Sequence, residues 1–111
     1  MTAAVSGTRV ESGGRSQFQG LFSEVWTVEA TIDFASTSGN STDVATISVP
    51  GIDPLTDILL GYSRATSYAD GADFDIAHIA TDSIHVIYHN DSGSPVNPAS
   101  SLYHFVVGRR V

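Results

Sequence analysis

The four histidines, His78, His85, His89 and His104, are the side chains of this sequence best suited to binding a metal ion. His85 and His89 fall in an apolar run that predicts a β-strand, where their rings would share one face roughly 13 Å apart. A single metal ion does not span that distance. His85 could instead face His78 or His104, because side chains paired across strands lie about 5 Å apart. Histidines on a sheet surface usually hydrogen-bond to water or to neighbouring polar groups, so we predict no metal site.

Three nearby acidic residues, Asp70, Asp73 and Asp75, resemble a calcium loop at first sight, since Ca²⁺ prefers several carboxylate oxygens. Their spacing does not match an EF-hand, which ends on a bidentate Glu. The 12 acidic residues could also supply a carboxylate pair for glycoside hydrolysis, but at this frequency such pairs arise by chance. We interpret the cluster as solvating a turn and protecting a sheet edge from aggregation.

No sequence motif of a known catalytic type is present. The chain has no glycine-rich phosphate loop, no Gly-x-Ser-x-Gly elbow and no His-Glu-x-x-His pair, and it has no cysteine. We therefore predict a non-enzymatic protein with no catalytic residues and no cofactor. Aromatic residues could form a sugar-stacking platform; the candidates are Trp26, Tyr62, Tyr68, Tyr88 and Tyr103. Trp26, however, is in phase with Val28 and Ile32, which predicts that it belongs to the core.

The charge balance argues against nucleic acids and anionic membranes as partners. The 111 residues include 12 acidic residues and five arginines, with no lysine, for a net charge of −7. Such a chain repels phosphate groups. The first twenty residues lack the apolar core of a secretion signal, so we expect synthesis in the cytoplasm. We interpret the two glycosylation sequons, at Asn40 and Asn90, as polar turns.

Period-two alternation dominates the chain from Val25 onward. Alternate residues from Trp26 to Phe34 are apolar, which predicts a strand with one buried and one solvated face. Further strands are predicted at 44–49, 58–62, 74–79, 84–89 and 102–109, separated by Gly, Pro, Ser and Asn. Six short strands without helical periodicity predict an all-β, antiparallel β-sandwich, jelly-roll-like, with a small barrel as an alternative.

Two parts of the chain differ in composition. Residues 1–22 are rich in Ser, Gly and Thr and contain only isolated hydrophobic residues, so we predict an extended N-terminal arm followed by a sandwich domain at 23–111. The arm contains Arg9 and Arg15, which could lie on an acidic neighbouring subunit. A frayed tail is the alternative.

The last predicted strand is apolar on both faces, with Leu102 and Val106 on one side and Tyr103, Phe105 and Val107 on the other. A strand of this kind needs two covering layers, which favours association with other chains. As interface residues we predict Arg9, Val10, Arg15, Phe18, Tyr103 and Phe105. As core residues we predict Trp26, Ile32, Phe34, Ile47, Ile84, Val86, Phe105 and Val107.

Residues 42–110 resemble a group of small tailed-bacteriophage virion proteins. The resemblance is carried by the turn Val49-Pro50-Gly51 with the later Asp57, by Asn90-Asp91-Ser92-Gly93, and by Asn97-Pro98-Ala99-Ser100 before Tyr103. Asn97 departs from the family, in which Asp is common. The resemblance implies a head decoration (cement) protein, a homotrimer on the outer capsid surface of the virion that binds the major capsid protein. A tail, neck or fibre module and a carbohydrate-binding β-sandwich are the alternatives.

Overall fold

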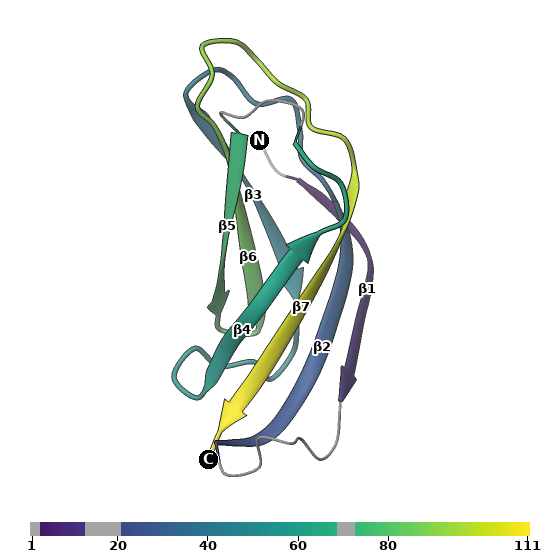
Figure 1. Ribbon diagram of the computed structural model, residues 1–111, viewed down its shortest axis with the longest axis vertical. Helices are drawn as coiled ribbons and strands as arrows, with labels where there is room; N and C mark the ends of the chain where they lie inside the picture. Colours follow the sequence, from purple (N-terminus) through teal and green to yellow (C-terminus); the bar gives the residue numbers. More distant parts are fainter. Residues whose placement is uncertain (1–2, 13–20, 69–72) are drawn as a thin grey trace.

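The computed structural model describes residues 3–12, 21–68 and 73–111 as two antiparallel sheets with no helix. Its seven described strands run along a body of 47 × 23 × 22 Å (Figure 1). They are β1 (Ala4–Ser12), β2 (Phe22–Asp33), β3 (Ser41–Ser48), β4 (Asp57–Arg64), β5 (Asp73–Ala80), β6 (Ser83–Asn90) and β7 (Ser101–Arg110). The predicted all-β, antiparallel fold class is confirmed, and all six predicted strands are present.

The strands are divided between two layers. One sheet has the order β1-β2-β7-β4 and the other the order β3-β6-β5. The pairing is nested along the chain, because β2 pairs with β7 and β3 pairs with β6. The innermost strands of this nesting, β4 and β5, are edge strands of different sheets and contact each other. Strands far apart in sequence therefore lie side by side, as in the central pair β2 and β7 (Figure 1).

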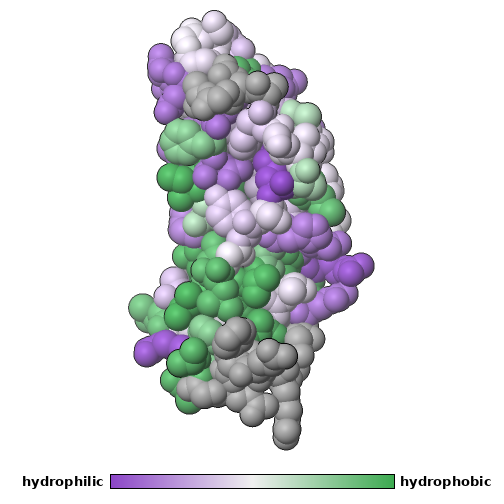
Figure 2. All heavy atoms as spheres, viewed as in Figure 1, coloured by the Kyte–Doolittle hydropathy of each residue, from purple (hydrophilic) through white to green (hydrophobic). Residues whose placement is uncertain are grey.

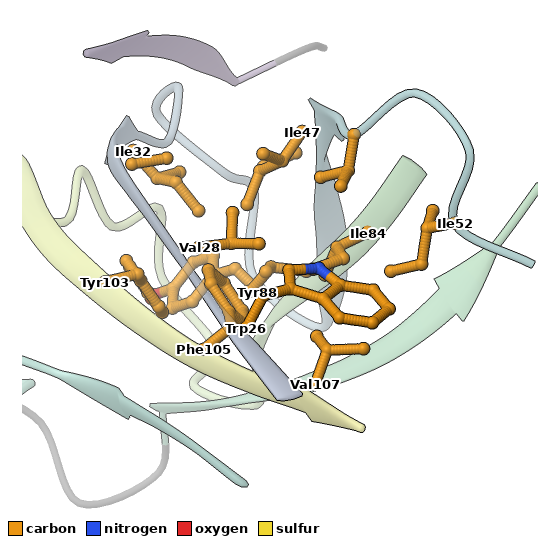
Figure 3. Packing of buried hydrophobic residues seen from close by; sticks show 14 of the residues in the cluster. Trp26, Val28, Ile32, Ile47, Ile52, Ile84, Tyr88, Tyr103, Phe105 and Val107 are labelled. Carbon is orange, nitrogen blue, oxygen red and sulfur yellow. The ribbon is translucent and has the colours of Figure 1, made fainter. Parts of the chain in front are cut away.

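The core lies between the two sheets and follows the predicted alternation. From Trp26 to Phe34 every second residue is at most 6% exposed, and Ala45, Ile47 and Val49 fill the opposite layer. All eight predicted core residues are buried. Trp26 lies among Val28, Ile84 and Val107 in the middle of this cluster (Figure 3). Burial of a large aliphatic or aromatic side chain contributes about 1.5–3 kcal/mol, so this cluster is the main source of stability.

Part of the expected arm is a strand. Residues 4–12 pair antiparallel with β2, from Ala4 opposite Asp33 to Glu11 opposite Thr27, with a bulge between Ser6 and Arg9. Gly7 has φ of +63° at this bulge, a conformation that favours glycine. An extended arm is therefore not confirmed over these residues, because backbone hydrogen bonds to β2 include a segment with few apolar side chains in the four-stranded sheet. β2 also begins at Phe22, inside the expected arm.

Asn90 organises the loops at one end of the two sheets. Its side chain is fully buried, and its amide nitrogen donates hydrogen bonds to the carbonyls of Thr37, Ser38 and Ser94. Its side-chain oxygen accepts bonds from the backbone and hydroxyl of Ser92. Attachment of a glycan would replace one of the two hydrogens of this nitrogen and place a bulky group at a fully buried position.

A buried ion pair closes the other end. The Asp57 carboxylate has no exposed side-chain surface and receives two hydrogen bonds from Arg109, at 2.8 and 3.1 Å. Arg109 also donates to the carbonyl of Gly51 and lies over the Trp26 ring at 5.3 Å. This pair joins the start of β4 to the end of β7 and covers the edge of the core.

Candidate interaction surfaces

The outer face of the three-stranded sheet is formed by alternate residues of β3, β5 and β6. Cross-strand pairing aligns Ile76, Ile87 and Val44 in one apolar row. Ile76 is 51% exposed and Val44 is 39% exposed, so this row faces solvent. We call the surface the histidine face, and its side chains are Thr42, Val44, Thr46, Phe74, Ile76, His78, His85, Ile87 and His89.

Ring contacts flank the apolar row on both sides. The Phe74 ring stacks on His89 with centroids 4.6 Å apart, and His78 meets His85 edge-on at 5.0 Å. The structure thus pairs His85 with His78, one of the two partners considered for it. His104 lies on the other sheet, with Nδ1 3.5 Å from Glu29.

No outward position of β3, β5 or β6, strands that are described over their full length, carries Asp, Glu or Arg. The aspartates of these strands occupy inward positions, where Asp43 is 1% and Asp73 9% exposed. The interpretation of the acidic cluster as solvated turn residues is therefore wrong for Asp73 and Asp75, and Asp70 lies outside the described residues. In a chain of net charge −7, a face without Asp, Glu or Arg avoids repulsion between carboxylates and the cost of removing water from these ions. It is well suited to contact another protein.

Asp75 is held on the inner side of β5 by three tyrosine hydroxyls. Tyr68 and Tyr103 donate to its Oδ2, each at 2.6 Å, and Tyr62 donates to Oδ1 at 2.8 Å. Burial and the hydrogen bonds to Asp75 raise the pKa of all three phenols above the ordinary value of 10.0. The phenols therefore stay neutral donors that link β4 and β7 to β5. These tyrosines, considered above for sugar stacking, serve a structural network instead.

A second apolar surface lies on the outer face of the four-stranded sheet. We call it the β4–β7 patch; it comprises Leu21, Phe22, Ile58, Leu60 and Val106, around a shallow hollow of about 480 Å³. Leu21 is 64%, Ile58 46% and Leu60 42% exposed. Figure 2, viewed from the same side as Figure 1, shows hydrophobic residues gathered over the part of this face where β4 and β7 lie.

Local backbone features create the β4–β7 patch. The register between β4 and β7 shifts between Leu59 and Gly61, so Leu60 is an extra, outward residue. Gly108 allows the Phe22 ring to lie directly over β7, since a Cβ there would be 2.7 Å from a ring carbon. Sequence reasoning expected an apolar outer face on the last strand but missed the contributions of Phe22 and the bulge, which depend on strand pairing.

The structure separates the predicted interface residues into three groups. Arg9 and Val10 are exposed on β1, where Arg9 pairs with Glu11 on the same strand at 2.9 Å. Tyr103 and Phe105 are fully buried between the sheets. The expectation that these two contact another subunit is corrected, because the outward face of β7 carries Leu102, His104 and Val106 instead. The remaining two, Arg15 and Phe18, lie outside the described residues.

Among the described residues, no group of three or more His, Asp or Glu side chains is arranged to hold a metal ion. No helix able to span a membrane is found over the same residues.

Comparison with known proteins gives no relative. No protein-family model, no curated protein and no solved structure matches the chain.

Proposed function

We propose that this chain is a non-enzymatic structural protein of a tailed-phage virion that decorates the outer head surface and stabilises neighbouring major capsid subunits. The observation that carries the proposal is the pair of exposed surfaces with apolar rows and without Asp, Glu or Arg on opposite sheets, the histidine face and the β4–β7 patch. Large exposed apolar patches on a soluble domain mark protein contacts. Two such surfaces allow one contact with copies of the same chain, as in a trimer, and another with the shell.

The strand order supports the proposal at the level of the fold. We interpret the nested pairs β2 with β7 and β3 with β6, together with the neighbours β4 and β5, as similar to the connectivity of a reduced jelly roll. Jelly rolls recur in viral capsid proteins and in lectins. This argument is an analogy of fold, and it adds weight only in combination with the surfaces and with the resemblance of residues 42–110 to virion proteins.

The experiment is to locate the chain in particles made from the genome that encodes it. Quantitative mass spectrometry should find the chain in purified heads, and electron cryomicroscopy should place its sandwich at regular positions on the outer lattice. Absence from particles, or density only on the tail, would overturn the head assignment.

Variants then test the two surfaces. Purified protein is added to particles that lack it, and the bound copies are counted. Ile76→Asp on the histidine face and Val106→Asp on the β4–β7 patch should each lower the affinity for particles or for copies at least tenfold, because a buried unpaired charge is costly. Ser63→Asp, at an exposed outward position of β4, is the matched control and should bind as the wild type does. Wild-type binding and assembly by both apolar-face variants would refute the proposal.

A further inference from the structure

Three of the four edges of the described sheets are partly covered by the protein itself. The edge of β3 accepts a hydrogen bond, at the carbonyl of Val44, from the backbone of Ala3. The edge strands β4 and β5 contact each other, and the Tyr62 hydroxyl of β4 donates to the backbone carbonyl of Asp75. The fourth edge is β1, at the end of the four-stranded sheet (Figure 1). Within the described part of the chain, residues 9–12 of β1 pair only with β2.

The second half of β1 has the geometry that a further strand needs. After the bulge between Ser6 and Arg9, the register with β2 is regular as far as Ser12. This stretch contains no proline, so every residue in it keeps its backbone N–H. The side chains of Arg9, Val10 and Glu11 are exposed. An edge with unpaired backbone groups is a template for another strand.

Charge selects the register in which a second copy of β1 fits this edge. Arg9 and Glu11 lie on the same side of the strand, with side chains 65% and 59% exposed, and form an ion pair at 2.9 Å. If two copies of β1 run antiparallel with Val10 opposite Val10, Arg9 of each copy lies opposite Glu11 of the other. Moving the two-fold axis to Arg9 or to Glu11 places like charges opposite each other, which destabilises strand pairing. The edge is therefore self-complementary in one register.

We propose that the β1 edge binds a second copy of this chain and joins the two four-stranded sheets about a two-fold axis at Val10. Glu29 of β2 lies opposite Arg9 on one side and opposite His104 of β7 on the other. Arg9 then faces Glu11 of the second copy, so acidic and basic side chains alternate across the joined sheets. Opposite charges on neighbouring strands stabilise their pairing. The contact involves neither the histidine face nor the β4–β7 patch, so the proposal does not depend on the virion role.

The first measurement is the self-association of the full-length protein. The bulge next to Gly7 keeps the regular stretch short. A small interface of this kind binds weakly, and we expect a dissociation constant on the order of 100 µM. Analytical ultracentrifugation from about 10 µM to about 1 mM covers this range. A salt concentration of about 0.1 M screens the general repulsion between two acidic chains.

Charge variants test the register. Arg9→Glu and Glu11→Arg each place like charges opposite each other in both halves of the pair and should weaken self-association about tenfold. An equimolar mixture of these two variants restores both opposite-charge pairs, so it should form heterodimers about as tightly as the wild type forms its dimer. Arg110→Glu is the matched control, because it changes the net charge as Arg9→Glu does at an exposed position of β7. It should associate as the wild type does.

Cysteine variants locate the axis. The chain contains no cysteine, so Val10→Cys introduces a single thiol. In the proposed pair this residue lies opposite its own copy, where Cα atoms are about 4.5–5.5 Å apart and within reach of a disulfide. Thr8→Cys is the control, because the two copies of residue 8 are about 13 Å apart along the strands. Mild oxidation should link Val10→Cys into a dimer and leave Thr8→Cys unlinked.

Three results would overturn the proposal. They are a wild type that stays monomeric at the highest concentration, a variant mixture that associates no better than its components, and equal linking of the two cysteine variants. A fourth result concerns the apolar surfaces. Association that is lost in Ile76→Asp or Val106→Asp but kept in Arg9→Glu and Glu11→Arg would assign the contact between copies to those surfaces. It would overturn the β1 contact and leave the proposed function in place.

Discussion

Loss of the Arg109 guanidinium should leave the buried Asp57 carboxylate without its counter-ion and destabilise the fold. The structure predicts both the size of this loss of stability and its pH dependence. In Arg109→Ala, Asp57 keeps its hydrogen bonds from the Asp53 backbone and the Thr56 hydroxyl, at 2.8 and 3.3 Å, but loses its counter-ion. Removing one partner of a fully buried ion pair costs roughly 3–5 kcal/mol. Because the Arg109 side chain is 38% exposed, water can partly replace it. We therefore expect a loss of about 2–3 kcal/mol at pH 7, including the contact with Trp26.

The pH dependence follows from the direction of the pKa shift. Burial alone raises the pKa of Asp57, but hydrogen bonds from Arg109, the Asp53 backbone and Thr56, together with the Arg109 charge, hold it below its ordinary value of 3.8. A lowered pKa means that the pair stabilises the fold above that value, and the contribution is lost as pH falls through the folded pKa. In Arg109→Ala burial prevails and raises the Asp57 pKa, so protonation relieves the buried charge. The stability difference between the two proteins should therefore shrink from pH 7 toward pH 3.

Urea unfolding followed by Trp26 fluorescence measures the stability loss at pH 7 and its change with pH. Equal slopes of the unfolding free energy against urea concentration are the check on two-state behaviour. Arg110→Ala is the matched control, since Arg110 is the exposed neighbour on the same strand and should change stability by less than about 0.5 kcal/mol. An Arg109→Ala protein as stable as this control at pH 7, or a difference that grows in acid, would refute the reasoning.

Three further predictions concern loops and tyrosines. In thermal unfolding, Gly39→Ala should destabilise the protein by about 1–3 kcal/mol, because its Cβ would be 2.6 Å from the Gly93 carbonyl carbon. Gly93→Ala is the control and should cost less, since a Cβ at that position meets no atom within 4 Å. Asn90→Ala should lower the free energy of unfolding by about 2–4 kcal/mol, since it removes the bonds that the buried amide donates to three carbonyls and those that it accepts from Ser92. A midpoint within 2 °C of the wild type, a shift of about 0.5 kcal/mol or less, would contradict this. In ultraviolet titration the three phenols bound to Asp75 should ionise only as the protein unfolds at high pH, because their pKa values are raised in the folded state. Their contribution to the stability of the fold is therefore lost as the pH rises past 10.0. Tyr103→Phe should remove one of these late-titrating groups, and early ionisation of all tyrosines would contradict the network.

The candidate surfaces show which strand faces can be predicted from the local alternation of polar and apolar residues. Alternation from Trp26 to Phe34 identified the buried side of β2, because polar and apolar residues take opposite faces there. The same reasoning could not choose between the faces of β7, where Leu102 and Val106 are nearly as apolar as Tyr103 and Phe105. The position of β7 between β2 and β4 decides that choice, since only one of its faces meets β3 and β6.

Pairing between distant segments explains the remaining differences. β1 has too few apolar residues to be recognised as a strand, yet its backbone groups find partners on β2. Asp75 lies in an acidic stretch that suggests a solvated turn, but β5 turns it inward toward three hydroxyls from other segments.

Composition and period-two alternation thus determined that this chain forms β-strands, which residues of the clearly amphipathic strands are buried, and that its charge disfavours polyanions. Both properties are local, because a strand's side chains alternate regardless of its neighbours. Which strands pair, which face of a two-sided apolar strand turns outward, and which acids lose contact with water were decided by the tertiary structure. Those outcomes depend on contacts between residues far apart in the chain, and no single stretch of sequence encodes them.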